Sequence, residues 1–422
     1  MLDAPYTRRL FLQRGAALAS ALASTPWFVE RSAAAMLAPP GLASTPGAPE
    51  DHILVVVQLA GGNDGLNTVV PVSLPEYHDA RPGIAVRERD ALALGGSGLA
   101  LHPALTGLKS LYDDGLVSII QGVGYPNPNR SHFASMDVWH TAQTAARGRG
   151  WLGRYFDNEC AGAPRPDIGV AIGDETPLAM QGQTVRPITF EDAHSFDFAP
   201  ARRDEALAGA YGAVMDAGVL PGTPADSNAA FLMRTALDAR LTGDRITDAV
   251  AVPALADYPR TGLAQQLKTA AAMIRAGLPT RVYYVSITGF DTHAGQGGAS
   301  GRHAQRLAEV GGALDAFQRD LRAAGDDARV LTLVFSEFGR RVGQNASGGT
   351  DHGAAAPMLL VGPMVRPGLL GAHPSLRDLD QGDLKYSIDF RRVYATALDR
   401  WMGADSRAVL GAGYHPIPAL RA

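Results

Sequence analysis

Aspartate, glutamate and histidine side chains gather beside the apolar runs of this chain of 422 residues. Carboxylate oxygens and imidazole nitrogens are ligands that Zn²⁺, Mn²⁺, Mg²⁺ and Ca²⁺ accept in proteins. The single cysteine, Cys160, excludes an internal disulfide framework and a metal cluster built from cysteines. We therefore predict that one or two divalent metal ions are held by Asp64, Asp291, His293, Glu337, Asp351 and His352.

A serine lies in a similar position. Ser131 stands between the apolar run at 116–121 and a segment with helical character, so it falls near a helix N-terminus, where free N–H groups favour an anion. Two ions a few ångströms apart would clamp an in-line displacement at phosphorus, with Ser131 or a water molecule as the nucleophile. We predict Ser131, His132 and Arg340 as the catalytic residues.

Each position also fits a purely structural role. Asn63-Asp64-Gly65 is typical of a turn, and Ser131 is a preferred N-cap residue. Asp291 with His293 fits a turn aspartate beside a solvent-exposed histidine, and the segment between 336 and 356 fits a solvated crossover loop. Polar residues recur at the ends of several predicted strands. This pattern favours a binding site, because ligands of open α/β sheets bind beyond the carboxyl ends of the strands.

The elements that would position these residues alternate along the chain. Short apolar runs bounded by Gly and Pro predict buried strands, as in a parallel sheet, and apolar residues at helical spacing predict helices. The alternation predicts a three-layer α/β/α sandwich with a mainly parallel sheet. Strands are expected at 53–59, 116–121, 168–172, 281–287, 330–335 and 357–361, and helices at 105–111, 203–217, 227–242, 262–276, 302–324 and 389–402.

Composition and absent motifs exclude several functional classes. A hydrophobic content of 46% with 19% charged residues is ordinary for a globular protein, and the net charge of −4 indicates no nucleic-acid partner. Gly122-x-Gly124 lacks the third glycine of a dinucleotide-binding turn, which disfavours a nicotinamide or flavin oxidoreductase. The sequence has no Gly-x-Ser-x-Gly nucleophile elbow either.

The N-terminal residues resemble a bacterial twin-arginine export signal. Arg8 and Arg9 precede hydrophobic residues and an Ala-rich stretch, which is too short and too broken by Pro26 to span a membrane. We expect a signal peptide over 1–35, a linker over 36–50, and a single domain over 51–422 with a peripheral insertion around 150–260. His194 and Asp197 in that insertion are expected to be surface or structural groups. The expected location is periplasmic or secreted, after folded export by the twin-arginine machinery.

Several motifs together resemble one family, the bacterial domain-of-unknown-function family fifteen-oh-one, which is grouped with the alkaline phosphatase and sulfatase superfamily. They are 59–65 (LAGGNDG), 129–133 (NRSHF), 289–293 (GFDTH), 335–340 (FSEFGR) and 349–353 (GTDHG). The resemblance covers nearly the whole mature chain and implies an alkaline-phosphatase-like fold.

The resemblance also implies roles for individual residues. Asp64 resembles the superfamily's metal ligand on the first strand, and Ser131 is similar in position to its nucleophile. Asp291 with His293 looks like its Asp and His pair, and His352 looks like its last metal histidine. The sequence departs from the pattern at Phe338, where the superfamily commonly has a metal-binding histidine, and Cys160 lacks the sulfatase nucleophile motif around it.

Two functional hypotheses follow. The first is an exported, metal-dependent hydrolase of phosphate or related anionic esters such as sulfates, acting on a small anionic ester or a glycan-linked substrate. The second, motivated by Phe338, is a catalytically degenerate binding or assembly protein on the same fold, with a periplasmic or cell-surface protein partner.

Overall fold

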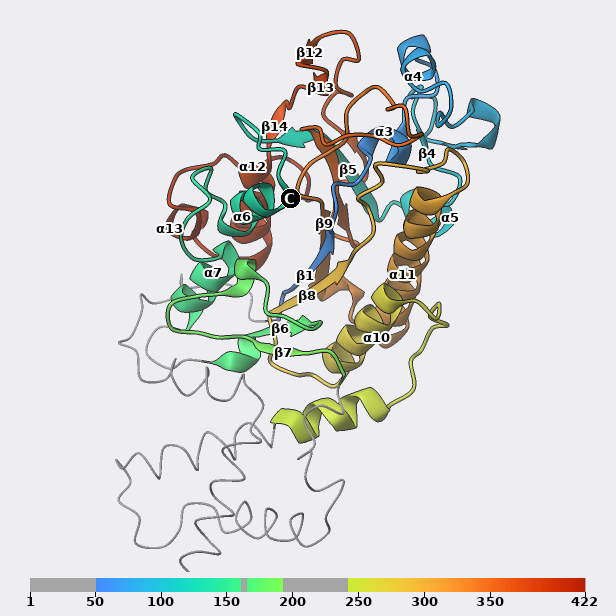
Figure 1. The fold of residues 1–422 in the computed structure, drawn as a ribbon. Helices are drawn as coiled ribbons and strands as arrows, with labels where there is room; N and C mark the ends of the chain where they lie inside the picture. The colour runs from blue at the N-terminus through green and yellow to red at the C-terminus, as the bar shows by residue number, and fades with distance from the viewer. Residues whose placement is uncertain (1–50, 161–164, 193–241, 422) are drawn as a thin grey trace, which may run out of the picture.

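The structure, a computed structural model, describes residues 51–160, 165–192 and 242–421. The expected export signal and linker, His194, Asp197, the helix expected at 203–217 and most of that at 227–242 lie outside these ranges. Within them, helices cover both faces of one large sheet (Figure 1).

The large sheet has nine strands in the order β11-β5-β10-β9-β1-β8-β6-β7, with β14 also paired to β5. Every pair is parallel except the two that involve β10, which runs antiparallel to β9 and β5. This confirms the predicted mainly parallel α/β sandwich. Its strands are β1 (Ile53–Leu59), β5 (Val117–Gly124), β6 (Gly169–Ile172), β7 (Ile188–Phe190), β8 (Val282–Ile287), β9 (Val330–Phe335), β10 (Ala356–Val361), β11 (Gly368–Leu370) and β14 (Ile388–Asp389).

The strand β10 is the antiparallel exception in the predicted mainly parallel sheet. Two neighbouring parallel strands need a crossover connection, usually a helix, whereas the 336–355 segment contains no helix and returns to the same edge of the sheet. The whole segment therefore stays at the carboxyl end of β9, so that Glu337 and His352 lie at one edge.

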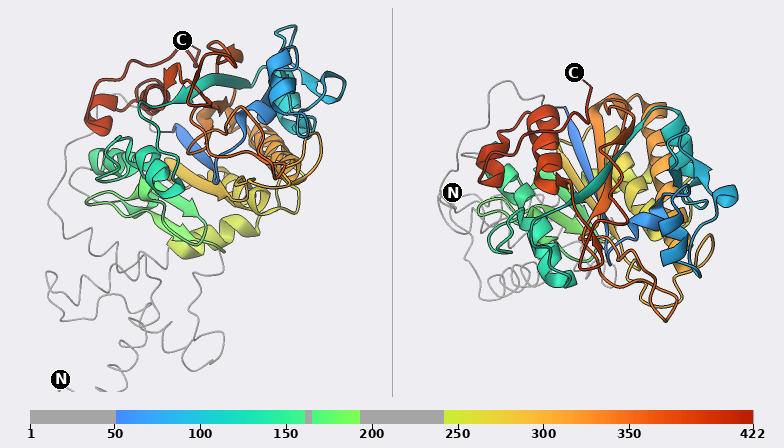
Figure 2. Two further views of the ribbon diagram at one scale, coloured as in Figure 1. Left: turned by 45° about the horizontal axis from the view of Figure 1, so that its top comes forward. Right: turned by 90° about the horizontal axis from the view of Figure 1, so that it is seen from above.

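The central strand β1 shows why both faces are covered. Ile53, Val55 and Val57 pack into a core formed with α5, α10 and α11, whereas Leu54 and Val56 pack into a second core with α6, α7, α12 and α13. Figure 2 shows these two groups of helices on opposite sides of the sheet. The helices are α5 (Thr106–Asp113), α6 (His132–Thr141), α7 (Trp151–Glu159), α10 (Gly262–Arg275), α11 (Arg302–Ala324), α12 (Phe390–Thr396) and α13 (Ser406–Leu410).

Several smaller elements complete the fold. A three-stranded sheet pairs β2, β4 and β3, a two-stranded sheet pairs β12 and β13, and residues 242–251 are helical. The helix predicted at 389–402 begins as α12 and continues as a π-helix over Ala397–Met402. The remaining bounds are α3 (Gly65–Thr68), β2 (Val69–Val70), α4 (Pro75–Ala80), β3 (Leu92–Ala93), β4 (Ala100–Leu101), β12 (Leu379–Asp380) and β13 (Asp383–Leu384).

The segment predicted as a peripheral insertion around 150–260 contributes directly to the large sheet. Its described part supplies β6 and β7, which extend the parallel sheet beyond β8 and place β7 at its edge. Among the helices of the described ranges, none combines the length and apolar character needed to cross a bilayer.

Candidate metal centre

Three loops that follow parallel strands meet at the carboxyl edge of the sheet. They come after β1, β8 and β9, and glycine permits their contact. Gly61, after β1, has a φ of +117°, and a Cβ there would lie 2.5 Å from the backbone nitrogen of Asp291. Only glycine adopts this conformation and permits this approach without strain. The loop after β1 therefore packs directly against the backbone of Asp291.

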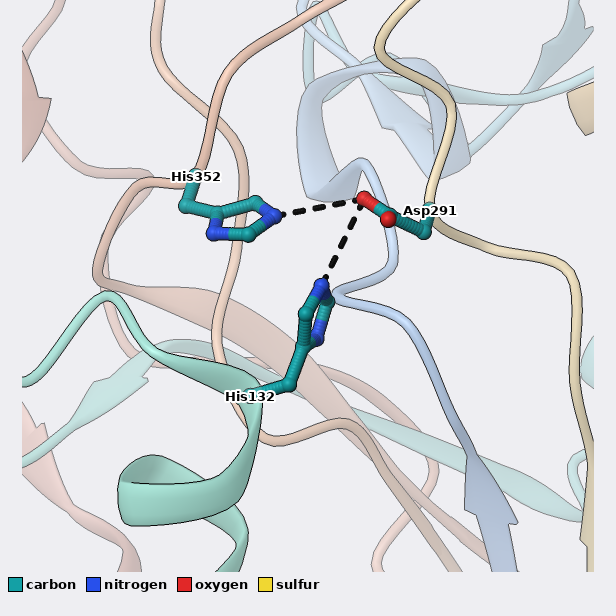
Figure 3. Close-up of side chains that lie close together, drawn as sticks. All are labelled: His132, Asp291 and His352. Carbon is teal, nitrogen blue, oxygen red and sulfur yellow. Dashed lines mark hydrogen bonds and ion pairs between the residues drawn. The ribbon is translucent and has the colours of Figure 1, made fainter.

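His132, Asp291 and His352 converge at this edge from three distant parts of the chain (Figure 3). His132 is the first residue of α6, Asp291 lies in the loop after β8, and His352 lies just before β10. The Oδ1 atom of Asp291 lies 3.5 Å from Nε2 of His132 and 3.2 Å from Nε2 of His352. The three ligand atoms lie within 4.8 Å of one another, so one ion could contact all of them.

Hydrogen bonds on the far side of each imidazole fix which nitrogen faces the centre. Nδ1 of His352 lies 2.6 Å from the backbone oxygen of Arg130, and Nδ1 of His132 lies 2.8 Å from Oε1 of Glu337. Both oxygens accept, so each neutral imidazole carries its proton on Nδ1 and presents a bare Nε2. Nε2 of His132 has no hydrogen-bond partner among the described residues.

His293 approaches the same carboxylate from the solvent side. Its Nε2 lies 3.2 Å from Oδ1 of Asp291 and 2.9 Å from Nε2 of His352. Its Nδ1 lies 3.1 Å from Oδ1 of Asp351, which also accepts from the Asn345 side chain at 3.1 Å. That Asn345 hydrogen bond is the main reason why the pKa of Asp351 is lowered. His293 therefore lies beside the cluster of His132, Asp291 and His352, and Asp351 orients it.

The spacing of these atoms fits a zinc-like site. Zn–N bonds are about 2.0–2.1 Å, so neighbouring ligands of a tetrahedral ion lie about 3.3 Å apart. The distances from Asp291 Oδ1 to Nε2 of His352 and of His132, 3.2 and 3.5 Å, bracket that value. A set of imidazole nitrogens with one carboxylate oxygen suits Zn²⁺ better than Ca²⁺ or Mg²⁺, which prefer oxygen.

The protonation states also suit a cation. Burial tends to raise the pKa of Asp291, but the hydrogen bond from Arg340 and the charge of that guanidinium outweigh it and lower the pKa to about 2. Burial lowers the pKa of His352. The hydrogen bond that His132 donates to the Glu337 carboxylate raises the pKa of His132, so a proton competes most strongly with a metal ion there.

Arg340, which was predicted as a catalytic residue, is buried and donates hydrogen bonds to several loops. Its Nε donates to Gly62 O at 2.7 Å, NH1 donates to Thr350 O at 2.8 Å, and NH2 contacts Asp291 Oδ1 at 2.7 Å as well as the carbonyls of Gly61 and Phe290. Since its N–H groups are bound to the protein, Arg340 holds three loops together and fixes Asp291.

Glu337 lies beneath the cluster, 1% exposed. Its Oε1 accepts from Gly61 N and pairs with His132 Nδ1, each at 2.8 Å, and its Oε2 lies 3.1 Å from the Ser336 hydroxyl. The predicted ligand role of Glu337 would compete with these contacts. The geometry favours Glu337 as a group that orients His132.

Asp64 lies outside this cluster, in a separate and fully buried network. Arg81 donates to its Oδ2 at 2.6 Å and Gln296 donates to it at 2.5 Å, while its Oδ1 has no hydrogen-bond partner among the described residues. Burial tends to raise its pKa, but the Arg81 charge and hydrogen bond lower it. The predicted ligand Asp64 is therefore not brought to the ion position defined by the other residues.

Ser131 and Phe338 lie next to the cluster, Ser131 on the surface and Phe338 in the interior. Ser131 is the exposed N-cap residue of α6, and its side chain makes no capping hydrogen bond. Phe338 is buried, with its ring centroid 5.0 Å from that of His132 and 4.7 Å from that of His352. An aromatic ring thus lies directly behind the two histidines.

Some contributors carry no recognisable sequence signal. The backbone carbonyl of Arg130 orients His352. The Arg130 side chain is held in turn by Asp383, whose Oδ2 lies 2.8 Å from Nε and 2.6 Å from NH2 of Arg130. The two residues are far apart in sequence and follow no motif. His132 could have been found as a ligand from its place at the start of a helix that follows a strand end.

A family model described as "Protein of unknown function (DUF1501)" matches residues 110–412. The chain belongs to this family. The predicted family is thereby confirmed, and the match includes all the clustered residues of this DUF1501 protein. No match was found among curated proteins.

Solved structures similar to this DUF1501 protein include a periplasmic domain, a sulfatase and an alkaline phosphatase. The C-terminal periplasmic domain of EcEptC from Escherichia coli, in complex with Zn, is 10% identical with a TM-score of 0.33, over 77% of each chain. PsFucS1 sulfatase from Pseudoalteromonas sp. is 11% identical with a TM-score of 0.36, over 96% of this chain and 74% of that one. Alkaline phosphatase from the Antarctic bacterium TAB5 is 9% identical with a TM-score of 0.32, over 75% and 91%. At these scores the likeness carries no weight for the activity of this chain.

Proposed function

We propose that this protein is a metal-dependent hydrolase of phosphate or related anionic esters. The observation that carries the proposal is the convergence of bare imidazole nitrogens on the anionic Oδ1 of Asp291. Groups that only accept hydrogen bonds repel one another unless a cation lies between them. Such a cluster at the carboxyl edge of a parallel sheet is where a catalytic centre of this fold class is expected.

Each residue then has a definite task. His132, His293 and His352 bind the ion through Nε2, and Asp291 supplies the negative charge. Glu337, Asp351 and the Arg130 carbonyl keep the imidazoles in the required tautomer, and Arg340 holds Asp291. When bound, a divalent ion of this kind lowers the pKa of a coordinated water and polarises an ester oxygen.

The nucleophile is assigned to water in this proposal. The Ser131 hydroxyl is exposed and makes no hydrogen bond to a base among the described residues, so nothing there would remove its proton. Ser131→Ala is expected to retain hydrolysis, whereas a serine nucleophile would make that variant inactive.

The test combines metal analysis with hydrolysis assays on protein expressed with its leader. Purified protein is expected to contain about one divalent ion per chain and to hydrolyse phosphomonoesters, phosphodiesters or sulfate esters. Asp291→Ala and His352→Ala should lose both properties and keep a wild-type circular dichroism spectrum. His415→Ala, which changes an exposed histidine outside the cluster, is the matched control. A folded, metal-free protein that is inert on all three ester classes would refute the proposal.

The domain organisation and location complete the proposal. Residues 51–422 would form one domain that is exported by the twin-arginine machinery to the periplasm or beyond. Cleavage near residue 35 and loss of export after replacing Arg8 and Arg9 by lysine would support this route.

A second candidate function rests on Phe338. Its buried ring occupies the space behind His132 and His352, as in a protein that has lost part of a larger metal site. A chain that binds one ion tightly, hydrolyses no ester and retains a periplasmic protein partner would favour this binding role.

A further inference from the structure

An open pocket of about 390 Å³ adjoins the metal centre. One wall carries His132, Asp291 and Glu337, which belong to the site already described. The other wall is apolar and includes Phe133 and Met136 of α6. A cavity of about 150 Å³ already holds one benzene ring, so this pocket has room for a substituted ring or a branched chain.

Phe133 is unusual in its exposure. It is 86% exposed, the highest value among the exposed large hydrophobic side chains of the described residues, the next being Val252 at 57%. A single exposed apolar residue needs no explanation, but this one directly follows the ligand His132 and faces a pocket. Met136, one helical turn later, lies on the same face of α6 and extends the apolar wall.

The charges around the pocket disfavour an anionic group there. No arginine or lysine lines it, whereas Asp291 and Glu337 both do. The nearby Arg340 is bound to Asp291 and backbone carbonyls, and Arg130 is paired with Asp383. A substituent with its own negative charges would meet two carboxylates and no free cation.

We propose that this apolar wall, Phe133 with Met136, binds the alcohol part of the ester, so that aryl and branched alkyl monoesters are preferred over esters of sugars and other hydroxylated or charged alcohols. This inference rests on the proposed function and narrows its substrate class. Ligand pockets commonly combine an aromatic wall with a few polar groups that fix the reacting end. Here the centre would take the anionic end, and Phe133 would stack on the apolar end.

The test compares kcat/KM of the metal-loaded full chain for phenyl phosphate and glycerol 3-phosphate. Phenol is the better leaving group in any enzyme, so the informative quantity is the change in the ratio upon mutation. Phe133→Ala is expected to lower kcat/KM for phenyl phosphate about 10-fold, the size of a lost aromatic contact with its buried area, and to change the glycerol ester less than about 2-fold. Phe133→Leu should keep most of the preference.

Met364→Ala is the matched control, since it removes an exposed apolar side chain at the opposite edge of the sheet, after β10 ends. It should leave both substrates unchanged. An equal loss on both substrates in Phe133→Ala, or no loss on either, would overturn the inference.

A binding measurement separates this inference from the proposed function. Phenylphosphonate and methylphosphonate cannot be hydrolysed, and calorimetry on the metal-loaded chain measures their affinities directly. We expect phenylphosphonate to bind about 10-fold more tightly, with the difference lost in Phe133→Ala. That result without any ester hydrolysis would refute the hydrolase and keep the subsite. Equal affinities alongside active hydrolysis would refute the subsite alone.

Discussion

Glu337→Gln distinguishes a carboxylate that orients His132 from one that binds the ion itself. In the structure Oε1 of Glu337 accepts from Gly61 N and pairs with Nδ1 of His132, while Oε2 faces the Ser336 hydroxyl. That hydroxyl lies 2.6 Å from Leu59 O, to which it donates. A glutamine can therefore place its oxygen at the Oε1 position and donate its NH2 to Ser336 Oγ.

The substitution keeps every hydrogen bond and removes only the charge. Partners of metal-bound imidazoles typically change metal affinity 10- to 100-fold, which corresponds to about 1.4–2.8 kcal/mol. We expect Glu337→Gln to weaken Zn²⁺ binding by about this amount. Glu337→Ala should in addition destabilise the metal-free fold, because burying the unpaired Gly61 N–H and His132 Nδ1–H costs about 1–3 kcal/mol each.

The assay is a competition titration of Zn²⁺ against a chromophoric chelator at pH 7.5, with urea unfolding of each metal-free variant alongside. Glu88→Gln, which neutralises an exposed glutamate in the 3₁₀ turn Glu88–Asp90, is the matched control and should bind like the wild type. His352→Ala supplies the reference for a lost ligand. If Glu337→Gln loses metal as completely as His352→Ala, then Glu337 is a ligand. If it binds like the wild type, the charge on Glu337 has no role. The first result contradicts the orienting role, and the second contradicts the role assigned to the charge.

Three further substitutions test the supports of the site and the fold. Gly61→Ala forces a side chain into a φ of +117° and against Asp291, so urea unfolding should show a loss of about 2 kcal/mol or more, with weaker metal binding. Asp383→Asn should weaken metal binding about 3- to 10-fold in the same titration, because it loosens Arg130, whose carbonyl holds a ligand imidazole; unchanged affinity would contradict this coupling. Burial lowers the pKa of His140 to about 4, whereas the unfolded chain takes up that proton near pH 6.5, so stability falls as the pH falls through this window. From pH 7 to 4.5 the wild type should lose about 3 kcal/mol more than His140→Gln in urea unfolding, and parallel losses would argue against the assignment.

The strands of the sheet were predictable because their burial leaves a strong signal. β1 and β9 are buried at every residue and read as continuous apolar runs, and the helix at 302–324 shows a regular apolar face. The direction of β10 could not be predicted, because an apolar run looks the same in either direction. Only the length and content of the connecting segment carried that information.

The location of the site was easier to predict than the residues that form it. The carboxyl ends of parallel strands share one edge, so loops that follow β1, β8 and β9 must meet there. The sequence could not show which acidic side chains face the proposed ion and which are paired with other side chains inside the protein. Asp64 and Asp291 stand in similar positions, but Arg81 and Gln296 bind Asp64 within the protein. Those two partners follow no spacing rule.

Phe338 limits the number of metal ions that the site could hold. Its ring lies so close to Gly62 that a Cβ there would be 2.2 Å from Phe338 Cε2, and it packs against both ligand histidines. A second ion behind His132 and His352 would meet carbon atoms in place of donors. Among the described residues, one group alone brings three or more metal-binding side chains together. A clamp by two ions is therefore disfavoured. In the proposed hydrolase, a single ion would have to supply the chemistry of both, which makes the orientation of each imidazole decisive.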